Sequence, residues 1–172
     1  MAKTLALDMD AVIFDLEDSV AEHAKQTAQE NLAAFFKANS ISAFFRIIRI
    51  NTPSRPRGLA DPERVRDLNP DAILLPKVEE PETISRIAGM LSPCKAARPV
   101  LWAICTVAMI ETPKGILQTA AIAAHPAITT LVVGPNDITA ATDVTPGKNR
   151  TNLHPWLMQI VLASHGVRML RA

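Results

Sequence analysis

Residues 100–137 read VLWAICTVAMIETPKGILQTAAIAAHPAITTLVVGPND and contain the pattern that decides the fold. A strongly apolar stretch at 100–110 is followed by 112–124, where apolar residues recur at helical spacing after a threonine and a proline that suit a helix start. A second apolar stretch follows at 130–134. Continuous hydrophobicity of this kind is typical of parallel strands covered on both faces. The sequence therefore predicts a strand, a helix and a second, parallel strand.

The same unit recurs along the rest of the chain. Strand starts are about 30 residues apart, as in strand-helix units that close into a barrel of roughly 250 residues. We therefore predict an α/β protein, an incomplete TIM (β/α)8 barrel of about five parallel strands, with residues 1–172 forming a single partial domain. An open doubly wound sheet is the alternative, but the first strand-to-helix turn lacks the glycine fingerprint of a dinucleotide site. The other predicted strands are 11–16, 44–51 and 72–78, the other helices are 22–38, 81–91 and 152–165, and 52–58 is predicted as an exposed loop.

Composition excludes several classes of protein. The formal charge is +1, with 18 basic and 17 acidic residues, and no basic block is long enough to bind nucleic acid. The longest apolar stretch, 100–110, is much shorter than the roughly 20 residues that cross a bilayer, so we expect no membrane association. Two isolated cysteines indicate neither a disulfide framework nor a zinc site. We expect a cytoplasmic protein.

Polar residues follow each predicted strand, at the end where parallel barrels carry their reacting groups. Glu111 and Asp137 follow neighbouring strands, and carboxylates are the ligands that magnesium prefers. They are therefore candidate Mg²⁺ ligands in one shared pocket. The alternative is that each carboxylate begins a helix and interacts with backbone amides there.

Arg49 lies inside an apolar run, where a permanent charge is costly unless an anion meets it. Arg46 lies three positions earlier, so the two arginines should face opposite sides of an extended strand. Arg49 could bind a substrate, or it could form a structural pair with a carboxylate at the end of a strand, such as Asp15, Glu17 or Glu79. Lys77 and Glu79 follow the third predicted strand, and the alternative for them is pairing with neighbouring strands.

Five motifs, in order along the chain, resemble the HpcH/HpaI aldolase and citrate lyase superfamily, and within it the citrate lyase beta-like CoA-ester lyases. Residues 10–20, DAVIFDLEDSV, resemble a strand signature of that family, and Arg49-Ile50-Asn51 resembles its arginine strand. Residues 75–79, LPKVE, resemble the next strand. Residues 110–115, IETPKG, and 134–137, GPND, resemble its two metal-bearing segments.

The resemblance implies Mg²⁺ as cofactor and carbon-carbon cleavage of a hydroxyacyl-CoA thioester of the citryl-CoA or malyl-CoA type. It implies Glu111 and Asp137 as metal ligands, with Glu111 and Arg49 catalytic and substrate-binding. The surrounding polar residues would be Glu17, Asp18, Lys77 and Glu79.

The resemblance also implies that strands of the barrel are missing at both ends of this chain, which favours a homo-oligomer because open sheet edges pair readily. Two alternatives remain at this stage. One is a catalytically silent barrel fragment, or a subunit that depends on a partner. The other is a pyruvate-type class II aldolase that needs no CoA.

Overall fold

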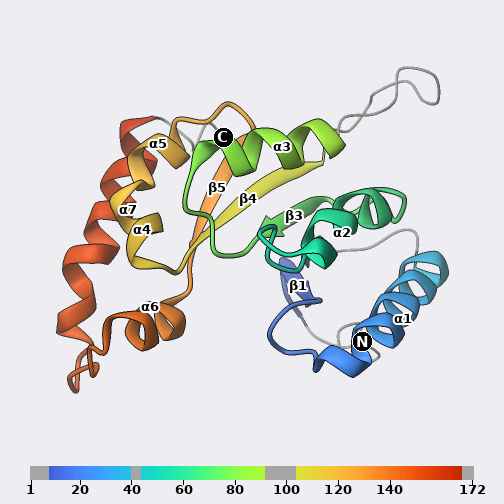
Figure 1. Cartoon of the computed structure of the whole chain (residues 1–172), viewed down its shortest axis with the longest axis horizontal. Coiled ribbons are helices and arrows are strands. Elements are labelled where there is room, and N and C mark those ends of the chain that lie inside the picture. The colour runs from blue at the N-terminus through green and yellow to red at the C-terminus, as the bar shows by residue number, and fades with distance from the viewer. Residues whose placement is uncertain (1–7, 40–43, 92–103, 168–172) are drawn as a thin grey trace. The chain divides into compact units, whose positions relative to one another are not determined.

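The computed structural model describes residues 8–39, 44–91 and 104–167 (Figure 1). Five strands alternate with helices, which confirms the α/β class. The chain divides into two compact units. The first contains residues up to Leu74 together with Leu91–Ile104, and the second contains Leu75–Met90 and Cys105–Ala172. The prediction of a single domain over 1–172 stays a prediction.

Three parallel strands run through the first unit. Strand β1 (Ala11–Asp15) pairs with β2 (Phe45–Arg49) so that Asp15 lies opposite Arg49, and β2 pairs with β3 (Ala72–Leu75). Phe14 and Ile48 are buried on these strands and pack among the core residues. Because the strands are parallel, the carboxyl ends of β1 and β2 lie together and bring their polar residues to one edge.

Helix α1 (Lys25–Ala38) covers the first unit after a short 3-10 turn, η2 (Glu22–Ala24). Its core face is built from Leu32 and Phe36, four positions apart, and the Phe36 ring meets that of Phe14 edge-on at 5.4 Å between centroids. Lys25, the first residue of the helix, does not face solvent. Its ammonium group is buried and donates to the backbone oxygens of Leu16 and Glu17, which tie the end of β1 to the helix.

Helix α2 (Pro56–Arg66) corrects the prediction of an exposed loop at 52–58. Only the first residues of that segment form a turn, and the helix begins at Pro56, a residue whose fixed φ suits the first helical position. Its few apolar residues include Val65, which is buried. The helix therefore depends on tertiary contacts more than on an apolar stripe.

Two parallel strands run through the second unit, β4 (Cys105–Ile110) and β5 (Ile128–Val133). They lie side by side with Ile110 opposite Val133, and the register shifts between Thr106 and Val107 (Figure 1). Residues 100–103 of the predicted strand lie outside the described residues, and β5 begins two residues earlier than predicted.

Helices surround this pair of strands. The predicted helix at 112–124 is divided at Gln118 into α4 and α5, and its cap is confirmed because Thr112 Oγ1 accepts the Gly115 amide at 3.0 Å. Helix α6 was not predicted. No helix within the described ranges is long and apolar enough to cross a membrane. The helices are α3 (Pro81–Leu91), α4 (Pro113–Leu117), α5 (Thr119–Ala123), α6 (Pro135–Thr142), η3 (Thr151–Leu153) and α7 (His154–Gly166).

Candidate functional site

Glu111 is the first residue after β4, and its side chain is only 1% exposed. Its Oε1 atom accepts the backbone amide of Lys77 at 2.8 Å. Gly134, the first residue after β5, donates its amide to Ile110 and lies directly against the Glu111 carboxylate. A Cβ atom at Gly134 would stand 2.4 Å from Glu111 Oε2. The carboxylate is therefore held in a fixed place by backbone on two sides.

Asp137 lies in the first turn of α6, three residues after Gly134. It is partly exposed. Since Ile110 and Val133 are register partners, the segments bearing Glu111 and Asp137 leave the sheet side by side. The structure thus brings the two predicted carboxylates to the same end of adjacent strands in one unit. Their role as metal ligands stays a prediction.

Lys77 contributes its backbone to this end of the unit. Its φ of 50° lies in the left-handed region, which is costly for a residue with a side chain and which aims its amide at Glu111. The next residue, Val78, donates to Met109 of β4, and a Cβ at Gly115 would stand 2.5 Å from the Val78 oxygen. Residues 77–78 are therefore held between β4 on one side and Gly115 on the other.

Glu79 is partly exposed and lies 3.7 Å from the ammonium group of Lys114. A second carboxylate, Glu80, lies 3.2 Å from the same group. A hydrogen bond to Glu80 and the charges of both carboxylates raise the pKa of Lys114. The contacts of Glu79 match the alternative of local pairing, and its predicted place around the metal site stays a prediction.

Arg49 lies in a carboxylate cluster at the ends of β1 and β2. Its guanidinium group donates to both oxygens of Asp15, at 2.7 Å and 2.5 Å, and lies 3.2 Å from Glu17 Oε2. The structural pairing considered from the sequence is therefore present. The role of Arg49 toward a substrate stays a prediction. Asp18, also predicted in this area, is exposed.

The charge of Asp15 is strongly stabilised. Burial alone would raise the pKa of Asp15, but hydrogen bonds from Arg49, Ser19 and the Glu17 amide outweigh it and hold that pKa well below its usual range. Arg46 faces the other side of the strand, as predicted: it stacks over the Phe36 ring at 4.9 Å. Arg49 is therefore the arginine that meets the strand-end carboxylates.

Sequence reasoning missed the glycine that contacts Glu111, and it missed Asp61. The signal for Gly134 was a glycine placed between a strand and a proline, where the backbone approaches a neighbour closely. Asp61 is fully buried in α2, and no signal pointed to it because no helix was predicted over that stretch.

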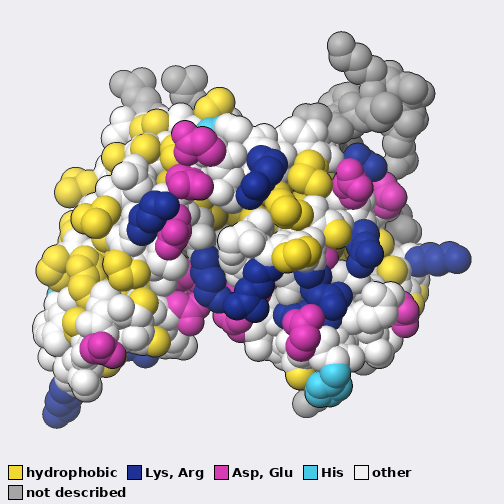
Figure 2. All heavy atoms as spheres, viewed as in Figure 1, with side chains coloured by type: hydrophobic (Ala, Val, Ile, Leu, Met, Phe, Trp, Pro, Cys, Tyr) yellow, Lys and Arg dark blue, Asp and Glu magenta, His cyan; other side chains and the backbone are white. Residues whose placement is uncertain are grey.

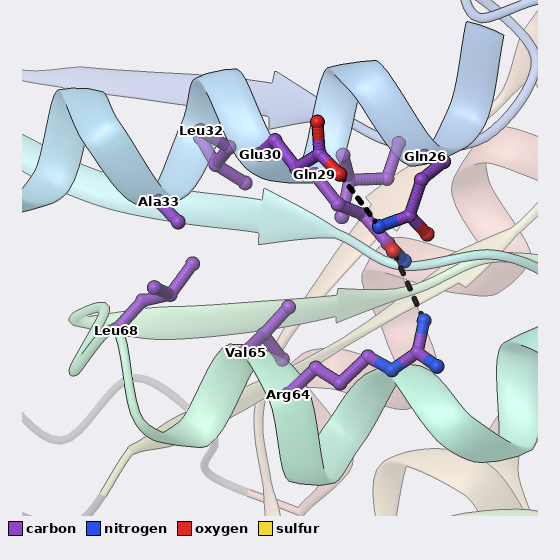
Figure 3. Close-up of a pocket in the computed structure, with 9 residues that line it drawn as sticks. Gln26, Gln29, Glu30, Leu32, Ala33, Arg64, Val65 and Leu68 are labelled. Atoms are coloured by element: carbon purple, nitrogen blue, oxygen red, sulfur yellow. Dashed lines mark hydrogen bonds between the residues drawn. The ribbon is translucent and has the colours of Figure 1, made fainter.

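A cavity lies between α1 and α2 in the first unit (Figure 3). Its floor is apolar, and at its rim Arg64 donates to Gln29 at 3.1 Å, as Figure 3 shows. It contains none of the predicted site residues. It is lined by Leu16, Gln26, Gln29, Glu30, Leu32, Ala33, Arg64, Val65 and Leu68.

Comparison with known proteins gives two relatives in sequence and one solved structure of similar fold. The chain is 37% identical over 138 residues to a (3S)-malyl-CoA thioesterase of Cereibacter sphaeroides, a match that covers 80% of this chain and 45% of the relative. It is 29% identical over 135 residues to a mitochondrial citramalyl-CoA lyase of Rattus norvegicus, covering 77% and 39%. The solved citrate lyase beta subunit of M. tuberculosis, complexed with oxaloacetate and magnesium, matches with a TM-score of 0.72 and 24% identity, covering 92% of this chain and 65% of that one.

The solved structure shares the fold of this chain. The chain spans less than half the length of both curated relatives. The family model for HpcH/HpaI aldolase/citrate lyase matches residues 1–169, almost the whole chain. The chain therefore belongs to the HpcH/HpaI aldolase/citrate lyase family.

Proposed function

We propose that this chain carries the magnesium-binding segments of a carbon-carbon lyase that acts on a hydroxyacyl-CoA thioester. The observation that carries the proposal is the Glu111 carboxylate, buried at the carboxyl end of β4 and held by the Lys77 amide beside the segment that leads to Asp137. Burial of a carboxylate is costly unless hydrogen bonds or a cation meet it. A cation bound at this end of the strands would offset the cost of burying the Glu111 carboxylate.

The residues fit a magnesium ion. Magnesium usually takes one or two protein carboxylates and keeps other positions for water and substrate. Among the described residues there is no group of three or more His, Cys, Asp and Glu side chains that could hold a metal. Two carboxylates, Glu111 and Asp137, therefore suit magnesium better than a metal that needs a full set of protein ligands.

Within the proposal, Glu111 and Asp137 hold the cofactor by their oxygen atoms. Bound there, Mg²⁺ would polarise the substrate's oxygen atoms and stabilise negative charge on them. Lys77 and Gly134 fix Glu111 in place, so that this carboxylate needs little reorganisation. Arg49, in the first unit, is proposed to bind substrate oxygen atoms, with Glu17 and Asp18 in its polar surroundings.

In the proposed reaction the substrate hydroxyl loses its proton and becomes a carbonyl. The electron pair of the broken carbon-carbon bond passes to the thioester enolate, which then takes up a proton to give an acyl-CoA. The lyase relative supports this activity by its name, and the family match over residues 1–169 supports it as well.

Thioester hydrolysis is a second candidate, because the thioesterase relative is more similar in sequence than the lyase relative, at 37% against 29% identity. In that reaction water attacks the thioester carbonyl and the carbon-sulfur bond breaks. The two activities give different products from malyl-CoA. Carbon-carbon cleavage yields acetyl-CoA and glyoxylate, whereas hydrolysis yields malate and the free thiol of CoA.

Calorimetric titration with Mg²⁺ tests the metal site. The parent chain is compared with Glu111→Gln and Asp137→Asn, which remove charge but keep shape. Glu82→Gln, an exposed carboxylate of α3, is the matched control. We expect the heat of binding to be lost in the first two variants and kept in the control. Equal heats in all four proteins would remove the metal site from the proposal.

Product analysis tests the reaction. Malyl-CoA is incubated with the chain and Mg²⁺, and acetyl-CoA, glyoxylate, malate and free thiol are quantified. Acetyl-CoA with glyoxylate supports the lyase, and malate with free thiol supports the thioesterase. Magnesium binding with no product would support the alternative of a fragment that needs a partner, and cleavage of a free hydroxy-keto acid would support the aldolase alternative.

A cytoplasmic homo-oligomer also remains part of the proposal. Hydrophobic side chains gather on the surface around α7 (Figure 2), where Met158 and Leu162 are 55% and 68% exposed. Exposed apolar side chains on one helix are typical of an interaction surface and support self-association. Light scattering after size-exclusion chromatography measures the assembly directly, and a monomer at all concentrations would contradict it.

A further inference from the structure

Asp61 is a carboxylate with no exposed surface, near the middle of α2. Its Oδ1 accepts the Gln29 amide at 2.7 Å, and its Oδ2 accepts both the backbone and the side-chain N–H of Asn51, at 2.9 Å and 2.7 Å. Burial of a carboxylate costs free energy of desolvation, and three short hydrogen bonds from uncharged donors offset that cost. Two of the three fix a single residue, Asn51, which follows β2.

The same face of α2 contacts the turn after β2 at a second point. Gly58 lies three positions before Asp61, and a Cβ there would stand 2.1 Å from the Thr52 oxygen and 2.5 Å from the Asn51 oxygen. The helix backbone thus touches the turn at Gly58, while the Asp61 carboxylate binds it one turn later. Residues 51–52 are held between the two contacts.

This turn connects to the carboxylate cluster of the first unit. Thr52 Oγ1 donates to Glu17 Oε1 at 2.6 Å. The other oxygen of Glu17 lies 3.2 Å from the Arg49 guanidinium. A continuous series of polar contacts therefore runs from Asp61 to Arg49: the hydrogen bonds of Asp61 with Asn51, the hydrogen bond of Thr52 with Glu17, and the ion pair of Glu17 with Arg49.

We propose that Asp61 is a positioning residue: through Asn51, Thr52 and Glu17 it sets the orientation of the Arg49 guanidinium group. Arg49 meets two carboxylates: its Nε and Nη2 groups donate to Asp15, and its Nη1 group lies against Glu17. The importance of Asp61 for catalysis rests on the proposed role of Arg49 toward the substrate. The control of the guanidinium geometry by Asp61 is independent of that role.

The test measures Arg49 itself, by the shift and solvent exchange rate of the protons on Nη1, the nitrogen that faces Glu17, in a ¹⁵N-labelled chain. Arg49→Lys identifies the resonance by removing it. Asp61→Asn keeps the shape of the side chain but replaces one acceptor oxygen with an NH₂ group. Asp67→Asn makes the same change at an exposed position just after α2 and is the matched control.

A second pair of variants acts at the other end of the series. Thr52→Val removes the hydroxyl but keeps the shape, and Thr52→Ser keeps the hydroxyl. We expect Asp61→Asn and Thr52→Val each to raise the exchange rate of the Nη1 protons about tenfold, roughly the effect of losing one contact with a charged group. Thr52→Ser and Asp67→Asn should match the parent. The double variant should exceed neither single one, because both act through the same contact.

Exchange in Asp61→Asn within twofold of the parent would overturn the proposal, as would fully additive effects in the double variant. Should Asp61→Asn not fold, Asn51→Ser takes its place, since it removes only one of the three bonds to Asp61; an unchanged Arg49 resonance there overturns it equally. The samples contain neither Mg²⁺ nor a CoA ester. Failure of the lyase proposal therefore leaves this result unaffected, and the reverse also holds.

Discussion

Gly134→Ala is a direct test of the geometry around Glu111. The φ of Gly134 is −103°, which any residue can adopt, so glycine is required here for space alone. The added Cβ would stand 2.4 Å from Glu111 Oε2 and 2.6 Å from Glu111 Cβ, whereas ordinary contact begins at 3.4 Å. The carboxylate must therefore shift by 1.0 Å (3.4 − 2.4).

A shift of that size would move a proposed Mg²⁺ ligand out of place. We expect Gly134→Ala to weaken Mg²⁺ binding by roughly 10- to 100-fold, as when the support of a metal ligand is disturbed. The crowding should also cost about 1–3 kcal/mol of stability, because the neighbours are a carboxylate and the side chain of Met109 rather than open space. Calorimetric titration measures the first effect and thermal unfolding the second.

Gly89→Ala is the matched control. Gly89 is exposed on α3, and nothing lies within 4 Å of a Cβ built there. This variant should bind Mg²⁺ as the parent does and should gain about 0.5–1 kcal/mol of stability, because alanine favours a helix. If Gly134→Ala bound Mg²⁺ with the parent's affinity, the position of Glu111 would not matter to the ion and the reasoning would fail.

Three further predictions concern stability. Because the pKa of Asp15 is lowered on folding, its contribution to the free energy of unfolding is complete above the unfolded pKa of about 3.9 and is lost as the pH falls below that value. Asp15→Asn should therefore flatten the dependence of the urea midpoint on pH between about 5 and 2. Thr112→Ala should cost about 1 kcal/mol by removing the cap on the Gly115 amide, a loss that Thr112→Ser should avoid in thermal unfolding. Lys77→Gly should raise the melting temperature, since a side chain in the left-handed region costs about 1–2 kcal/mol, and an unchanged or lower value would contradict the strain.

Strand positions could be predicted from the sequence because buried parallel strands are continuously apolar. The strand-end rule also placed Glu111 and Asp137 correctly at the ends of adjacent strands. Helix α2 was not predicted, because its sequence is mostly polar and contains Pro62. Its place is fixed by tertiary contacts such as those of Asp61 with the turn after β2.

The other features that the sequence did not reveal also depend on tertiary contacts. Nothing in the sequence indicated that two backbone oxygens at the end of β1 bind the ammonium group of Lys25. The amide of Lys77 became visible only in three dimensions, because φ at one residue is set by what surrounds it. Side-chain type predicted where the candidate site residues lie, whereas tertiary contacts determine which groups hold those residues in place.

The left-handed turn at Lys77 has a consequence for recognising proteins built in the same way. What reaches Glu111 is a peptide N–H, a group that every amino acid except proline possesses. Asparagine or glycine at this position would deliver the same donor with less steric penalty. A search that demands lysine there would therefore overlook chains whose backbone performs the identical task.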